Sequence, residues 1–129
     1  MTNKYIVTTT INYPTVATKK FCKIADEKDW KFIVVGDTKT PHDDYYKLKE
    51  DYNNFEYLHP EDQEKLYPAL SETIGWKSIQ RRNIGLIYAY DQGAELIATI
   101  DDDNIPYDEW GDNVLVGKTI EVDIFDHKY

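Results

Sequence analysis

The sequence predicts an α/β fold in which a single domain, residues 1–129, holds an open, mostly parallel β-sheet flanked by helices. Short runs of β-branched and other apolar residues alternate with helical segments along the chain. Most of these runs are apolar throughout, which is typical of strands buried on both faces of a parallel sheet. No repeat, linker or low-complexity segment divides the 129 residues, so we expect one domain.

The first half of the chain is predicted to contain three short strands separated by helices. These strands are Tyr5–Thr9, Lys31–Val35 and Phe55–Leu58. The first helix spans Val16–Lys28, with Thr15 as its N-cap and its apolar residues on one face. A less periodic stretch, residues 43–52, is compatible with a short helix. Residues 60–67 are predicted to form a helix that begins at a proline and ends where Pro68 interrupts it.

The longest helical pattern, Trp76–Gln92, precedes the fourth predicted strand. Its apolar stripe consists of Trp76, Ile79, Leu86, Ile87 and Tyr90. Asn83 falls in the middle of this stripe, which predicts a buried amide that must be hydrogen-bonded. Arg82 falls at the edge of the stripe and can reach a site beside the sheet, whereas Arg81 is predicted to face solvent. Gly93 then ends the helix in the left-handed conformation.

The fourth strand, Leu96–Ile100, runs directly into three consecutive aspartates. Because Asp101, Asp102 and Asp103 repel one another, a divalent cation with the phosphates that it carries would explain their place at a strand end. The alternative is a solvated acidic turn. Farther on, residues 118–125 alternate apolar and polar side chains, which is typical of a half-exposed strand that is antiparallel or at an edge of the sheet.

Polar residues follow three of the predicted strands. Since the carboxyl ends of parallel strands meet at one edge, we expect residues 8–12, Asp37 and the aspartates to line one cleft. An acidic residue at the position of Asp37 can accept hydrogen bonds from a ribose or a base, or it can stabilise its own turn. The absence of a Gly-x-Gly-x-x-Gly or Walker A sequence argues against dinucleotide-binding and NTPase folds.

Composition narrows the class of partner. A net charge of −9 and the absence of any basic cluster larger than a pair argue against nucleic acid as a partner. No apolar stretch approaches the length of a signal peptide core or a membrane span, which predicts a cytoplasmic protein without a membrane segment. The single cysteine, Cys22, is interpreted as a packing residue, and His42 and His59 as loop or cap residues rather than metal ligands.

Two stretches of the sequence resemble a known family. Residues 79–85, which include the Arg82-Asn83 pair, lead through the strand at residues 96–100 into the aspartates. This series resembles the nucleotide-sugar half of the GT-A glycosyltransferases, with their Asp-x-Asp motif. Residues 35–41 and 61–63 extend the resemblance to STELLO-like transferases and, more loosely, to the reversibly glycosylated polypeptides that act as UDP-sugar mutases. The resemblance covers residues 4 to 106.

The resemblance implies roles for individual residues. Asp103 would be a direct ligand of Mn²⁺ or Mg²⁺, Asp101 would hold the ribose or support the metal through water, and Asp102 would assist. The residues expected to contact the nucleotide sugar are Thr8, Thr9, Thr10, Asp37, Arg82, Asn83, Asp101 and Asp102, and those expected at the metal are Asp101 and Asp103. Among these, the threonines and Asp37 would contact uracil and ribose.

The function that follows is a metal-dependent glycosyltransferase that uses a nucleoside-diphosphate sugar, with UDP-sugar favoured and an unknown acceptor. Only 23 residues follow Pro106, so the acceptor part is expected to be minimal or missing, and a second subunit could supply parts of it. No catalytic base is assigned; the remaining candidates are Asp123, Asp126 and His127. The alternatives are a non-catalytic nucleotide-sugar-binding module and a UDP-sugar mutase.

Overall fold

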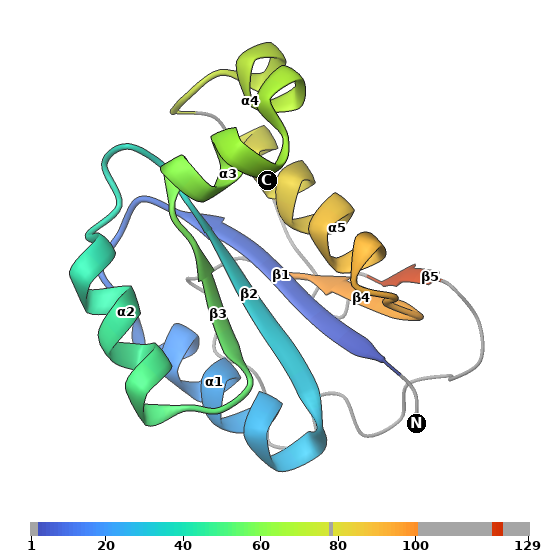
Figure 1. The fold of residues 1–129 in the computed structure, drawn as a ribbon. Coiled ribbons are helices and arrows are strands. Elements are labelled where there is room, and N and C mark those ends of the chain that lie inside the picture. Colours follow the sequence, from blue (N-terminus) through green and yellow to red (C-terminus); the bar gives the residue numbers. More distant parts are fainter. Residues whose placement is uncertain (1–2, 78, 101–119, 123–129) are drawn as a thin grey trace.

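A parallel β-sheet forms the centre of the protein, as the sequence predicts (Figure 1). The computed structural model describes residues 3–77, 79–100 and 120–122. The strands are β1 (Lys4–Thr10), β2 (Trp30–Gly36), β3 (Phe55–Leu58), β4 (Leu96–Thr99) and β5 (Ile120–Val122). Their order across the sheet is β3-β2-β1-β4-β5, and every neighbouring pair is parallel. The central strands β1, β2 and β4 therefore end at the same edge.

Helices cover both faces of this sheet. The helical elements are α1 (Val16–Lys28), α2 (His42–Asp51), α3 (Pro60–Leu66), α4 (Pro68–Ile74), the 3-10 turn η1 (Ile79–Arg81) and α5 (Arg82–Asp91). Figure 1 shows α1 and α2 on one side of the sheet and α5 on the other. Side chains of α1 and α2 share one buried cluster with their face of the sheet, and side chains of α5 and α4 share another with the opposite face. This is the predicted layered α/β architecture. Among the described residues, no helix is both long and apolar enough to cross a bilayer.

The helix α1 illustrates how local sequence signals determine an element. It begins at Val16 and ends at Lys28, as predicted, and the side chain of Thr15 accepts a hydrogen bond from the backbone N–H of Thr18 at 3.1 Å. Cys22 lies in the core and is fully buried, which confirms the packing interpretation. Burial, together with the nearby carboxylate of Asp26, raises the pKa of the Cys22 thiol to about 12.

The last strand confirms one of the two predicted arrangements. β5 lies at the edge of the sheet, but it runs parallel to β4, with Leu96 opposite Ile120. The antiparallel alternative is therefore wrong. Alternation of polar and apolar residues indicates that one face of a strand is exposed. It does not indicate whether an edge strand runs parallel or antiparallel to its neighbour.

The prediction of one continuous helix over Trp76–Gln92 is wrong. Gly75 and Lys77 have φ angles of 73° and 59°, which a right-handed helix does not allow, so the chain reaches α5 through a loop and the turn η1. Two short helices, α3 and α4, precede this loop, and Pro68 begins the second of them. Proline suits this first position because its missing N–H would have no partner inside the helix.

The face that α5 turns toward the sheet also differs from the predicted one. Ile84, Gly85 and Ala89 are buried, whereas Ile87 and Tyr90 of the predicted stripe are exposed. The prediction followed the large apolar residues on one face, but the helix packs on the sheet through another face, which contains Ile84 and the small residues Gly85 and Ala89. A Cβ atom added to Gly85 would lie 2.5 Å from a methyl carbon of Val7, so the absence of a side chain permits this approach.

Candidate functional site

The hydroxyl of Thr8 connects the end of β1 to the segment that leads into the aspartates. Its Oγ1 donates a hydrogen bond to the carbonyl of Ile100 at 2.8 Å, and the backbone N–H of Ile100 donates to the carbonyl of Val7 at 3.2 Å. Thr8 is almost completely buried. These bonds hold Ile100 beside β1 at the carboxyl edge of the sheet. Asp101 follows directly in the chain, but all three aspartates lie outside the described residues.

Other threonine hydroxyls hold neighbouring segments of the same edge together. Oγ1 of Thr9 donates to the carbonyl of Val35 at 2.8 Å, and Oγ1 of Thr40 donates to the carbonyl of Thr10 at 2.6 Å. Oγ1 of Thr10 accepts a hydrogen bond from the backbone N–H of Asn12 at 3.0 Å. The structure thus brings the predicted residues Thr8, Thr9 and Thr10 to the expected edge. Their contacts within the chain position the strand ends there.

Asp37 follows β2 and is only 2% exposed. One carboxylate oxygen, Oδ1, accepts hydrogen bonds from the backbone N–H and the hydroxyl of Thr38 at 2.6 and 3.2 Å. The other, Oδ2, accepts one from the backbone N–H of Lys77 at 2.7 Å. These are the contacts expected of a turn-stabilising aspartate, and they also bind the loop before α5 to the sheet. Ribose or base recognition by Asp37 stays a prediction.

Arg82 and Asn83 form the first turn of α5, which follows the loop that Asp37 holds. Arg82 is partly exposed, consistent with its predicted place at the edge of the helix's buried face. Asn83 is exposed, so the prediction of a buried amide is wrong. It fails because α5 turns a different face to the sheet: Ile84, Gly85 and Ala89 are buried, while Asn83 shares the exposed face with Ile87 and Tyr90.

The position of Arg81 differs most from its prediction in this region. Instead of facing solvent, it is fully buried between α3, α4 and the loop after α4. Its Nη1 donates to the carbonyls of Ser71 and Gly75 at 3.0 and 3.3 Å, and its Nη2 donates to Oε1 of Gln63 at 2.5 Å and Oγ of Ser71 at 3.0 Å. The guanidinium carbon lies 3.7 Å from the centre of the Trp76 ring. Burial lowers the pKa of Arg81.

Gln63 extends this network to the sheet. Its Nε2 donates to the carbonyls of Gly36 and Leu58, the last residues of β2 and β3, at 2.7 and 2.8 Å. The pair formed by Gln63 and Arg81 therefore joins two strand ends to α4. The signal in the sequence that could have revealed this arrangement is Gly75, which marks the end of a helix immediately before Trp76.

A cluster of two histidines and a tyrosine lies beside β3. Nδ1 of His42 and the hydroxyl of Tyr57 are 2.5 Å apart, and the rings of His42 and His59 have centres 4.2 Å apart. His59 acts as a helix cap, as predicted, because its Nδ1 accepts a hydrogen bond from the backbone N–H of Glu61 at 3.0 Å. Burial and the neighbouring His59 lower the pKa of His42. Both histidines thus have structural partners.

Replacing Thr8 with valine tests the connection to Ile100. The substitution keeps the shape of the side chain but leaves the carbonyl of Ile100 without its buried donor, so Thr8→Val should lower the free energy of unfolding by about 1–2 kcal/mol. Denaturant titration followed by circular dichroism measures this change. Thr73→Val, at an exposed position of α4, is the matched control and should change stability little. An equal effect of the two substitutions would contradict the role of the Thr8 hydroxyl.

Comparison with known proteins adds an independent observation. Over 101 residues the chain is 29% identical to a protein of Arabidopsis thaliana named "Probable glycosyltransferase STELLO1". The matched region is 78% of this chain but 12% of that protein, so the chain corresponds to a small part of its relative. No family model matches the sequence.

Proposed function

We propose that this chain is the nucleotide-sugar-binding part of a metal-dependent glycosyltransferase, with a UDP-sugar as the favoured donor. The similarity to a probable glycosyltransferase supports a transferase of this general kind. The observation that carries the proposal furthest is the hydrogen bond from Thr8 to Ile100, which holds the segment entering the Asp101–Asp103 sequence at the carboxyl edge of a parallel sheet. Ligands of open α/β sheets bind outside this edge.

The carboxylates of the three aspartates suit a hard cation. Carboxylate oxygens are preferred ligands of Mg²⁺ and Mn²⁺, and we expect Asp101 and Asp103 to hold the ion while Asp102 assists. When bound, such an ion neutralises charge on a diphosphate leaving group. Within the part of the chain that the structure describes, no three His, Cys, Asp or Glu side chains gather as a metal site. The aspartates themselves lie outside that part.

The chain's own residues would orient the nucleotide. Thr9 and Thr10 are the last residues of β1, and we expect the carboxylate of Asp37, directly after β2, to accept a hydrogen bond from a ribose hydroxyl in addition to its bonds within the chain. Arg82, at the start of α5, can donate hydrogen bonds to a phosphate or a uracil oxygen. The exposed amide of Asn83 lies one residue farther along the same turn.

Nucleotide binding tests this proposal directly. Titration calorimetry of UDP should show binding that strengthens with Mn²⁺ and weakens when the metal is removed with a chelator. Because a ligand stabilises the state that binds it, UDP with Mn²⁺ at about 100 times its dissociation constant should raise the free energy of unfolding by about 2.7 kcal/mol. GDP serves as the competing nucleotide, and we expect it to bind more weakly.

Two substitutions make the test specific. Asp103→Asn should remove most of the Mn²⁺-dependent gain in UDP affinity, and Arg82→Ala should weaken UDP binding with or without metal. Asp51→Asn, at the exposed end of α2, is the matched control for the loss of one carboxylate. Absence of binding by any nucleoside diphosphate in the presence of Mn²⁺ would refute the proposal.

A further inference from the structure

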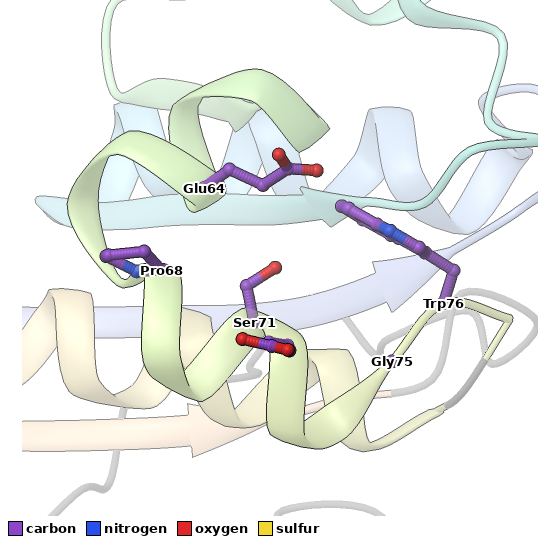
Figure 2. A pocket seen from close by; sticks show the side chains of 6 residues that line it. Glu64, Pro68, Ser71, Gly75 and Trp76 are labelled. Atoms are coloured by element: carbon purple, nitrogen blue, oxygen red, sulfur yellow. The ribbon is translucent and has the colours of Figure 1, made fainter.

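A pocket of about 460 Å³ opens between α3, α4 and the loop that follows α4. Its lining residues are Glu64, Pro68, Ser71, Glu72, Gly75 and Trp76. In Figure 2 the side chains of Glu64, Ser71 and Trp76 point toward one another across this space. The volume falls within the range of about 300–1,000 Å³ that is typical of small-molecule sites. None of these residues belongs to the proposed nucleotide site.

The pocket combines one flat aromatic surface with several hydrogen-bond acceptors. The indole of Trp76, with Pro68, offers apolar surface on which the C–H face of a ring can pack. The carboxylates of Glu64 and Glu72 accept hydrogen bonds but donate none. Hydroxyl groups are suitable donors for them, and O–H bonds to a carboxylate are among the strong ones. A ligand with one apolar face and several hydroxyls meets both requirements.

The positive charge behind Trp76 disfavours a cationic group stacked on that ring. The guanidinium of Arg81 lies 3.7 Å from the centre of the Trp76 ring and donates hydrogen bonds to Ser71 and Gly75, so a buried positive charge stands directly behind the lining. A second cation on Trp76 would be repelled by it. The two carboxylates in turn disfavour an anion. A neutral ligand rich in hydroxyls avoids both penalties.

The pocket also adjoins the edge where we expect the donor. The backbone N–H of Lys77, the residue after Trp76, donates to Oδ2 of Asp37 at the end of β2. We propose that this pocket binds a neutral saccharide and that this saccharide is the acceptor of the transferase. The acceptor role rests on the proposed function, whereas saccharide binding can be tested by itself.

The probes are methyl β-D-glucopyranoside, methyl β-D-galactopyranoside and cellobiose, titrated into the full chain labelled with ¹⁵N. We expect saturable shifts of the Trp76 indole N–H resonance, assigned by its loss in Trp76→Phe, with at least one of them. Glu64→Gln and Glu72→Gln should each weaken this binding about tenfold, because a hydrogen bond to a charged acceptor is replaced by a weaker one. Glu50→Gln, an exposed position on α2, is the matched control and should leave the affinity unchanged.

Three results would overturn the proposal. The first is the absence of a shift of the Trp76 signal with all three saccharides. The second is saccharide binding that Glu64→Gln and Glu72→Gln leave unchanged. The third is binding of putrescine, a diamine, without binding of any saccharide. UDP titrated into the same sample separates the two proposals: saccharide binding without UDP binding refutes the nucleotide-sugar function and with it the acceptor role, but leaves the saccharide pocket, whereas the reverse refutes only the saccharide pocket.

Discussion

Arg81→Ala should lower the free energy of unfolding by about 3 kcal/mol, one of the largest effects of a single substitution in this chain. The guanidinium makes four hydrogen bonds from a fully buried position, and the four acceptor atoms, on Gln63, Ser71 and Gly75, would each lose a donor. The stacking with Trp76 would be lost as well. Chemical denaturation of the purified variant measures the change.

Two control variants show whether the loss of stability depends on the two hydrogen-bonding nitrogen atoms, Nη1 and Nη2, of the guanidinium. Arg81→Lys keeps the charge but cannot reach these acceptors with two nitrogen atoms, so it should recover only part of the lost stability. Arg82→Ala removes the neighbouring arginine, which is partly exposed, and should cost much less. If Arg81→Ala and Arg82→Ala destabilised the protein equally, the burial of Arg81 would not be important for stability.

Arg81→Ala should also affect the edge of the sheet where we propose that the nucleotide binds. Arg81 holds the carbonyl of Gly75, and the N–H of Lys77 two residues later binds Asp37. Loosening this loop would remove one of the hydrogen bonds that fix the Asp37 carboxylate. Stability and UDP affinity should therefore fall together in Arg81→Ala, whereas in Arg82→Ala the UDP affinity should fall with a much smaller loss of stability.

The elements that the sequence predicts well are those with strong local signals. The strand Phe55–Leu58 and the helix Val16–Lys28 have the predicted bounds, because turn residues, the Thr15 cap and a clear period mark their ends. The shared carboxyl edge follows from the parallel order and brings Thr8 and Asp37 to the expected side. Hydropathy cannot distinguish a parallel from an antiparallel edge strand, which explains the uncertainty over β5.

The side chains around the start of α5 depend on tertiary packing and were harder to predict. A helical projection gives the angles between residues but not which face packs on the sheet, and α5 buries the face of Ile84, Gly85 and Ala89 instead of the one that contains Asn83. Arg81 lies in the turn η1, outside the α-helix that the projection assumes. The partners of Arg81, Gln63 and Ser71, are 18 and 10 residues away. Gly75 signals where a helix ends before Trp76, but no local pattern in the sequence indicates which residues Arg81 contacts.

Gly85→Ala should lower the free energy of unfolding by about 1–2 kcal/mol, although alanine favours helices by about 1 kcal/mol over glycine. The added Cβ would lie 2.5 Å from Cγ1 of Val7 and 2.6 Å from Cγ2 of Val35, both of which are fully buried. Neither valine can move away in a packed core, so α5 must move outward and lose part of its contact with the sheet. Thermal or chemical denaturation measures the loss.

Asn83→Ala is the matched control in the same helix. Because Asn83 is exposed, this substitution should leave stability unchanged or raise it slightly through helix propensity. Val7→Ala is expected to destabilise the protein by itself, but it also makes room for the new methyl group. Gly85→Ala should therefore cost less in the Val7→Ala background than in the native chain, with a coupling of about 1 kcal/mol. Strict additivity of the two substitutions would show that α5 does not approach β1 this closely. The missing side chain of Gly85 would then not explain why the face of α5 with Ile84 and Gly85, rather than the face with Ile87 and Tyr90, packs on the sheet.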